Sequence, residues 1–245
     1  MYYTLGAVAF IIGCGWGVRN LVRFNFSLFA ATAIITCGVY GGLLGSRILY
    51  VLYSDPEYLL NYPMQAFAFW QGGLAWLGGP PLAVVVMAIG LKLTGHPVMH
   101  GLGHIAPGLA LSHALARISC LVEGCCYGQP TQMPWAIYSQ RAEAHVHPTP
   151  IYSMGGELIA FFVLQRLLVD RKWSAFGMPL YFVLLGTHRF IFEFFRGDPA
   201  GAMFIPHLRF YQSVALILLI LGIMWMAAVA MIFRTGRDEE NPQDS

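Results

Sequence analysis

The chain has 245 residues, of which 57% are hydrophobic and 11% are charged, and its formal net charge is only +2. Soluble domains carry about 25% charged residues, so an ordinary soluble domain is excluded, and the small charge argues against a nucleic-acid partner. Frequent glycine and aromatic residues are typical of helical membrane bundles, where glycine permits close packing and aromatic rings lie at the interfaces. The composition predicts an all-α polytopic membrane protein, which we expect to be a monomer.

Apolar stretches of about 17 to 25 residues are long enough to cross a hydrocarbon core about 30 Å thick. Seven such spans are predicted, over residues 2–18, 27–53, 73–93, 99–120, 151–168, 176–194 and 208–233. An interfacial arm is expected at about 54–72 and a polar outer loop at about 121–149. Residues 1–234 would then form a single transmembrane domain, followed by a disordered cytoplasmic tail at 235–245.

The orientation follows from the basic residues, which cluster after the first, fifth and seventh predicted spans. These residues are Arg19, Arg23, Arg171, Lys172, Arg234 and Arg237. Because basic residues favour the cytoplasmic side, the N-terminus is expected outside and the C-terminus inside. The first span lacks a preceding basic region, so no cleavable signal peptide is predicted.

Three arginines lie at a similar depth near the outer ends of different spans: Arg47, Arg117 and Arg189. A charged side chain within a span costs at least ~2.5 kcal/mol, so such residues usually pair, line a cavity or bind a ligand. Each alone could extend to the interface. Three at matched depth, followed by Arg196, favour an anion site, and guanidinium groups suit the phosphate of a lipid headgroup.

Local spacing supplies partners for two of these arginines. Arg189 and Glu193 stand four residues apart on one helical face, which predicts an ion pair that holds Arg189 in position. His113, Arg117 and Cys120 also share one face.

Cys120, Cys125 and Cys126 cluster with Glu123 at the outer end of the fourth span. A disulfide between Cys120 and one of the other two is one interpretation. A thiolate activated by nearby Arg117 is another. The spacing does not match a zinc finger, so neither a metal nor another cofactor is predicted.

His147 lies in the segment His-Pro-Thr-Pro-Ile-Tyr, just before the fifth span. It is either a loop histidine that bonds to the backbone or a base near an arginine-bound phosphate. His145 and His188 are further candidates for that base.

Six short segments occur in order between about residues 40 and 200. They are residues 45–50 (Gly-Ser-Arg-Ile-Leu-Tyr), 71–79 (Gln-Gly-Gly-Leu-Ala-Trp-Leu-Gly-Gly), 104–107 (His-Ile-Ala-Pro), 117–124 (Arg-Ile-Ser-Cys-Leu-Val-Glu-Gly), 147–152 (His-Pro-Thr-Pro-Ile-Tyr) and 189–196 (Arg-Phe-Ile-Phe-Glu-Phe-Phe-Arg). Together they resemble the motifs of the prolipoprotein diacylglyceryl transferase family. The members of that family are membrane enzymes that move diacylglycerol from phosphatidylglycerol to a lipoprotein cysteine.

The resemblance implies seven spans in the bacterial inner membrane, with an active site that faces the periplasm or outer side. An acceptor nucleophile would attack the glyceryl C3 carbon, and glycerol phosphate would leave. Arg117 and Arg189 would hold the phosphate and stabilise its developing charge, while Glu193 would orient Arg189. Glu123 or His147 would handle the acceptor proton. The remaining expected substrate-binding residues are Arg47, Gly78, Gly79, Cys120, Cys125, Cys126, Tyr152 and Arg196.

The chain also departs from the family pattern. Leu77 stands where the family has a histidine, Cys120 and Cys125 replace an asparagine and a glutamate, and the outer domain is shortened. These differences indicate a divergent relative with a Gly-Cys-Cys-Tyr-Gly signature at 124–128 and an unidentified acceptor. Two other interpretations remain open: a lipid-binding or lipid-moving protein without chemistry, and a membrane thiol redox protein.

Overall fold

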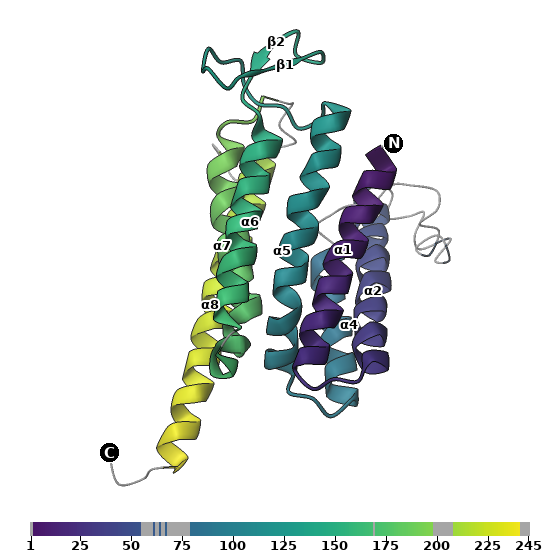
Figure 1. Ribbon diagram of the computed structural model, residues 1–245, viewed down its shortest axis with the longest axis vertical. Helices are drawn as coiled ribbons and strands as arrows, with labels where there is room; N and C mark the ends of the chain where they lie inside the picture. The colour runs from purple at the N-terminus through teal and green to yellow at the C-terminus, as the bar shows by residue number, and fades with distance from the viewer. Residues whose placement is uncertain are drawn as a thin grey trace. The chain divides into compact units, whose positions relative to one another are not determined.

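The computed structural model describes residues 2–54, 61, 64, 67, 79–168, 170–197 and 208–240. Within these ranges the α-helices are α1 (Tyr2–Arg23), α2 (Leu28–Ser54), α4 (Gly79–Leu93), α5 (Val98–Glu123), α6 (Thr149–Leu167), α7 (Gly177–Glu193) and α8 (Phe210–Glu240). A hairpin of β1 (Ile137–Ser139) and β2 (Ala144–Val146) separates α5 from α6, and the short 3-10 helix η4 (Arg171–Phe176) precedes α7 (Figure 1).

Each predicted span corresponds to one of these helices, which agrees with an all-α membrane protein. Among the described residues, five helical stretches are long and apolar enough to cross a membrane: Thr4–Arg23, Leu28–Val51, Val98–Glu123, Lys172–Glu193 and Tyr211–Thr235. The apolar helix α4 is shorter, with 15 residues. Most of the predicted arm at 54–72 lies outside the described residues. Helix α8 continues to Glu240, past the point where the tail was expected to begin.

The chain forms two compact units, and each is described by itself. The second unit, residues 18–102, contains α2 packed against α4. A Cβ atom on Gly79 would lie 2.6 Å from Ser46 Oγ, so glycine permits this close packing. Arg47 lies on α2 with only 6% of its surface exposed, and its guanidinium is 5.7 Å from the Tyr50 ring.

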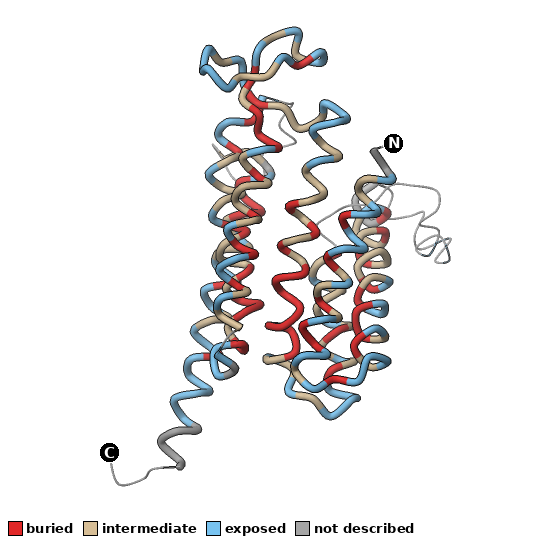
Figure 2. Tube along the Cα trace, in the orientation of Figure 1, coloured by how far each residue is buried: buried red, intermediate tan, exposed pale blue. Residues whose placement is uncertain are grey.

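The first unit, residues 1–17 and 103–245, carries the candidate site. Helix α7 packs against both α6 and α8 (Figure 1). Only 11% of the most apolar stretch of α8 is buried, against 39% in the stretch that contains α7. Much of α8 is exposed (Figure 2). Its exposed residues include large aliphatic side chains such as Ile217, Ile220 and Met224, as suits contact with lipid.

The segment between α5 and α6 is an ordered structure rather than a plain loop. β1 and β2 pair antiparallel, with Tyr138 opposite His145. Two isolated bridges extend this arrangement, one between Pro130 and Val146 and the other between Gly128 and Arg196. The second bridge ties the segment to the residues that follow α7, which places the segment over the candidate site.

Candidate functional site

A small pocket lies where α5 and α7 end and α6 begins. Its lining residues are Arg117, Cys126, Thr149, Pro150, Ser153, Arg189, Phe192 and Arg196. The structure therefore brings together three of the arginines that the sequence suggested for a phosphate. Arg47, the fourth, belongs to the other compact unit. Gly78 lies outside the described residues, and Gly79 also belongs to the other unit.

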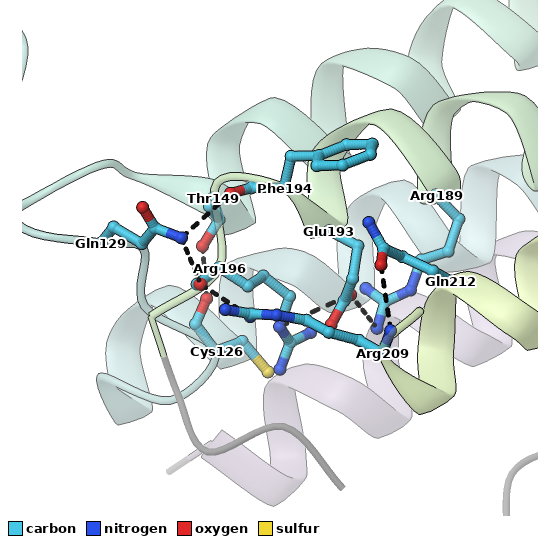
Figure 3. Close-up of polar contacts among 9 residues, drawn as sticks. All are labelled: Cys126, Gln129, Thr149, Arg189, Glu193, Phe194, Arg196, Arg209 and Gln212. Carbon is cyan, nitrogen blue, oxygen red and sulfur yellow. Dashed lines mark hydrogen bonds and ion pairs between the residues drawn. The ribbon is translucent and has the colours of Figure 1, made fainter. Parts of the chain in front are cut away.

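A buried carboxylate sets the position of two of these arginines. Glu193 is 2% exposed, and its Oε2 lies 3.2 Å from Nη2 of Arg189 and 3.8 Å from Nε of Arg196 (Figure 3). The ion pair expected from the four-residue spacing is thus present. The Tyr211 ring lies 5.0 Å from the Arg189 guanidinium carbon and 5.6 Å from that of Arg196. Such cation–π contacts hold the planar groups from a further side.

The backbone of Arg196 is held by two side chains from elsewhere in the chain. Arg209 Nη1 donates to the Arg196 carbonyl at 2.8 Å, and Gln129 Nε2 donates to the same carbonyl at 3.4 Å and to the Phe194 carbonyl at 3.1 Å (Figure 3). The bridge to Gly128 adds a main-chain contact. The turn after α7 is therefore bound on two sides, and this fixes where the Arg196 side chain begins.

Gly128 is necessary for this close crossing of two chain segments. A Cβ atom there would lie 2.4 Å from the His147 carbonyl oxygen and 2.9 Å from the Phe195 carbonyl oxygen. We expect Gly128→Ala to lower stability by about 1 to 3 kcal/mol, because backbone atoms must move apart to accept the methyl group. The midpoint of thermal unfolding in detergent would report this loss.

Gly155→Ala is the matched control, since a Cβ atom on Gly155 meets nothing within 4 Å. This control should keep or slightly raise the midpoint, because alanine favours a helix by about 1 kcal/mol over glycine. Equal midpoints for Gly128→Ala and the unmodified protein would show that the crossing is not tightly packed.

The cysteines converge because of the way α5 ends. Gly124 has a φ of 67°, and its N–H donates to the Leu121 carbonyl, while the Cys125 N–H donates back to the Cys120 carbonyl at 3.1 Å. This is the Schellman pattern, in which a left-handed glycine reverses the chain. Cys126 is also left-handed, with a φ of 59°. The three sulfur atoms lie within 4.8 Å of one another, and no disulfide joins these cysteines in the structure.

Charge is distributed unevenly over these sulfurs. A hydrogen bond from Cys120 lowers the pKa of Cys126 to about 5, and the positive charges of Arg196 and Arg117 act in the same direction against the effect of burial. Burial, followed by the charge of Cys126, raises the pKa of Cys125 to about 11. At neutral pH, Cys126 is therefore the thiolate, and it faces the arginine pocket (Figure 3).

The arginine pocket carries a net positive charge. The guanidinium groups of Arg117, Arg189 and Arg196 supply three positive charges, and Glu193 with the Cys126 thiolate removes two. The positive charge that remains attracts anions, and guanidinium groups pair well with phosphate oxygens.

A second, larger pocket of about 370 Å³ adjoins the cysteines. It is lined by Cys120, Leu121, Val122, Glu123, Gly124, Cys125, Tyr127, Ile137, Tyr138, Ser139, Gln140, Arg141, Val146 and Pro150. Glu123 lies here and not in the arginine pocket, with its carboxylate 3.8 Å from Arg141. Glu123, expected from the sequence to handle the acceptor proton, is therefore not among the residues that line the arginine pocket.

His147 and Tyr152, two residues named from the sequence, contact each other. His147 Nδ1 is 3.1 Å from the Tyr152 hydroxyl, and that hydroxyl accepts a hydrogen bond of 2.7 Å from Trp135 Nε1. Neither residue lines the two pockets described above. His145, an alternative base, is exposed on β2 against the Tyr138 ring.

A buried polar cluster that was not predicted from the sequence lies one helical turn deeper than the arginine pocket. Glu157 is 1% exposed, and its Oε1 lies 3.3 Å from His188 Nε2 and 3.6 Å from His113 Nδ1. The Tyr181 hydroxyl is 2.5 Å from the same His113 nitrogen. An isolated carboxylate within an apolar span was the available signal, because such residues usually have a partner or a function.

Comparison with known proteins places this arrangement in a family. Residues 1–228 match the family model described as prolipoprotein diacylglyceryl transferase. Three curated relatives are each named phosphatidylglycerol–prolipoprotein diacylglyceryl transferase. The relative from Cupriavidus pinatubonensis is 30% identical over 214 residues, which cover 85% of this chain and 74% of the relative. The relatives from Cupriavidus metallidurans (31% identical over 186 residues, covering 74% of this chain and 65% of the relative) and Clostridium tetani (31% identical over 194 residues, covering 76% of this chain and 75% of the relative) are similar. This chain belongs to the prolipoprotein diacylglyceryl transferase family.

Proposed function

We propose that this chain transfers the diacylglyceryl group of phosphatidylglycerol to a cysteine thiol of a lipoprotein precursor and releases glycerol phosphate. One observation carries the proposal: three guanidinium groups, those of Arg117, Arg189 and Arg196, line a single pocket and provide the positive charge that a phosphate requires. The names of the relatives supply the donor and the class of acceptor.

In this reaction the acceptor thiolate attacks the C3 carbon of the glyceryl group. The carbon–sulfur bond forms as the carbon–oxygen bond to phosphate breaks, and the bonding electrons leave with glycerol phosphate. Negative charge therefore grows on the phosphate. Guanidinium groups that are already in place stabilise this charge without reorganisation, which is the usual origin of the largest catalytic effect.

The other predicted residues have supporting roles in this proposal. Glu193 positions Arg189 and Arg196 through its two ion pairs. Arg47 and the Gly78–Gly79 pair remain candidate substrate-binding residues, because they match family motifs. His147 and Tyr152 contact each other beside the start of α6, and His147 remains a candidate base for the acceptor proton.

We also propose that the chain crosses the inner membrane seven times as one monomeric transmembrane domain, with the pocket facing the periplasm. In the first unit, Arg166, Lys172 and Arg234 lie at the helix ends opposite the pocket. Because basic residues favour the cytoplasmic side, the pocket is assigned to the outer side.

The test uses the purified full-length protein in lipid nanodiscs that contain phosphatidylglycerol labelled in its headgroup glycerol. A lipoprotein precursor peptide with one cysteine serves as acceptor, and the same peptide with serine is the control. We expect equal amounts of water-soluble glycerol phosphate and of cysteine-lipidated peptide, and neither with the serine peptide. Tight lipid binding without either product would instead indicate a lipid-binding protein without chemistry.

A further inference from the structure

The cluster of Cys120, Cys125 and Cys126 has the ligand types of a metal site, and its sulfur atoms are close enough in space to share one ion. Their sulfur atoms all lie within 4.8 Å of one another. Zinc binds thiolates at about 2.3 Å with tetrahedral angles, so two sulfurs on one ion lie roughly 3.8 Å apart. Side-chain rotations that move each sulfur by less than about 1 Å would close this difference.

The backbone already holds the three cysteines in this arrangement. The Cys125 N–H is bonded to the Cys120 carbonyl. The Thr149 hydroxyl donates to the Cys126 carbonyl at 2.5 Å, which ties the loop to the start of α6. A site that is held in place before the metal arrives loses little conformational entropy on binding.

The cluster also borders both pockets. Cys120 and Cys125 line the larger pocket of about 370 Å³, whereas Cys126 lines the arginine pocket. An acceptor that enters the larger pocket therefore reaches the cysteines from one side, and a phosphate held by the arginines lies on the other. This is where the two substrates of a transferase must meet.

We propose that Cys120, Cys125 and Cys126 bind one zinc ion whose fourth position takes the acceptor thiol. This inference rests on the proposed transferase function and adds to it the means by which the acceptor is activated. It departs from the sequence analysis, which predicted no metal because the spacing does not match a zinc finger.

Zinc suits these ligands and this chemistry. Thiolates select zinc or copper(I) over magnesium or calcium, and zinc with three protein ligands keeps one tetrahedral position for a substrate. Three thiolates and one Zn²⁺ carry a net charge of −1, which is favourable because Arg117 and Arg196 line the same pocket as Cys126. Zinc would also explain how the acceptor proton is removed without the family histidine, which is Leu77 in this chain. No histidine in either pocket is then required.

The step is balanced without an oxidant or reductant. A thiol loses its proton to solvent when it coordinates zinc. Its sulfur then attacks the glyceryl carbon, the carbon–oxygen bond breaks, and glycerol phosphate leaves with the bonding electrons. The thioether product is neutral and binds zinc more weakly than a thiolate, so it dissociates and the zinc stays on the three cysteines.

Metal content is the first test, because it does not depend on activity. The full-length protein is treated with chelator, reloaded with Zn²⁺, and analysed by elemental mass spectrometry. We expect one zinc per chain for the unmodified protein and for the control Cys37→Ser, whose cysteine lies on α2 in the other unit. Cys120→Ser, Cys125→Ser and Cys126→Ser should each lose most of the zinc.

Cobalt supplies a spectroscopic check on the ligands. Co²⁺ loaded in place of zinc should show sulfur-to-cobalt charge-transfer absorption, which Cys126→Ser abolishes and Cys37→Ser retains. Addition of the cysteine peptide should change this spectrum, whereas the serine peptide should not. Absence of bound zinc in the unmodified protein, preferential binding of copper(I), or a zinc content in the three cluster variants equal to that of the unmodified protein would overturn the proposal.

Activity then separates this inference from the proposed function. Glycerol phosphate release should fall by at least about 100-fold after chelation and return with one equivalent of Zn²⁺. Full activity in chelated protein would refute the zinc site and leave the transferase intact. If zinc-loaded protein releases no glycerol phosphate, the proposed transferase function is wrong. The measured zinc content then decides by itself whether the three cysteines bind zinc.

Discussion

Replacement of Arg189 or Arg117 by alanine is expected to lower the maximal rate of glycerol phosphate release by about 10²- to 10³-fold. Both guanidinium groups line the pocket proposed for the phosphate. Charge on the leaving phosphate is larger in the transition state than in the bound lipid. The loss should therefore appear mainly in kcat and less in KM for phosphatidylglycerol. Initial rates over a range of lipid concentrations in nanodiscs measure both parameters.

Arg234→Ala is the matched control for these variants. Arg234 is an exposed arginine on the same unit as the pocket, near the other end of α8. It lies 23 residues after Tyr211, which is roughly 35 Å along the helix. This variant should keep the full rate. If Arg117→Ala and Arg189→Ala were also fully active while correctly inserted, the phosphate site would lie elsewhere.

Arg189→Lys separates charge from shape. Lysine keeps the positive charge but not the planar pair of donors that guanidinium offers to a carboxylate or a phosphate. In the pocket this fork contacts Glu193 and stacks on Tyr211. We expect a rate between those of the unmodified protein and Arg189→Ala. A rate equal to that of the unmodified protein would show that charge alone is needed.

Glu193→Gln is the second change with a large expected effect. The carboxylate is 2% exposed and pairs with both Arg189 and Arg196. Removal of one partner from a buried ion pair leaves uncompensated charge and typically costs about 3 to 5 kcal/mol. The two guanidinium groups, both against Tyr211, would also repel each other and turn away from the phosphate. We expect a lower unfolding midpoint and at least about a tenfold loss in kcat.

Two comparisons test whether Glu193 positions the arginines or only stabilises the fold. Asp170→Asn removes the exposed pair with Lys172, whose nitrogen and oxygen are 3.5 Å apart, and should cost about 0 to 1 kcal/mol with no change in rate. Glu193→Asp keeps the charge, so it should restore part of the kcat that Glu193→Gln loses. If kcat were unchanged in Glu193→Gln at a temperature where the protein is folded, the carboxylate would have no positioning role.

The helices, the pair of Arg189 and Glu193, and the family could be predicted from the sequence because each depends on residues that are close together in the chain. Each apolar stretch became a helix because its residues can satisfy their backbone hydrogen bonds within one segment. The pair of Arg189 and Glu193 follows from helical geometry alone, since residues four apart share a face. The order of the six motifs was enough to indicate the family, which the match over residues 1–228 shows.

Tertiary structure decided which of the suggested residues share a site. Arg196, Cys126 and Arg117 lie in one pocket because the turn after α7 crosses the loop after α5, a contact that depends on Gly128 and on the hydrogen bond from Arg209. Glu123 and His147 could each accept a proton, but neither lines that pocket. Glu123 pairs with Arg141, and His147 contacts the Tyr152 hydroxyl.

The physical reason is the range of the interactions. Helix formation, capping and pairs four residues apart depend on neighbours in the chain, so the sequence by itself determined the helices, their order and the Arg189–Glu193 pair. The Glu157 cluster joins α5, α6 and α7, and the thiol cluster borders two pockets that several segments build. Such sites depend on how each helix is rotated and where distant loops cross, and packing sets both only once the whole unit has formed.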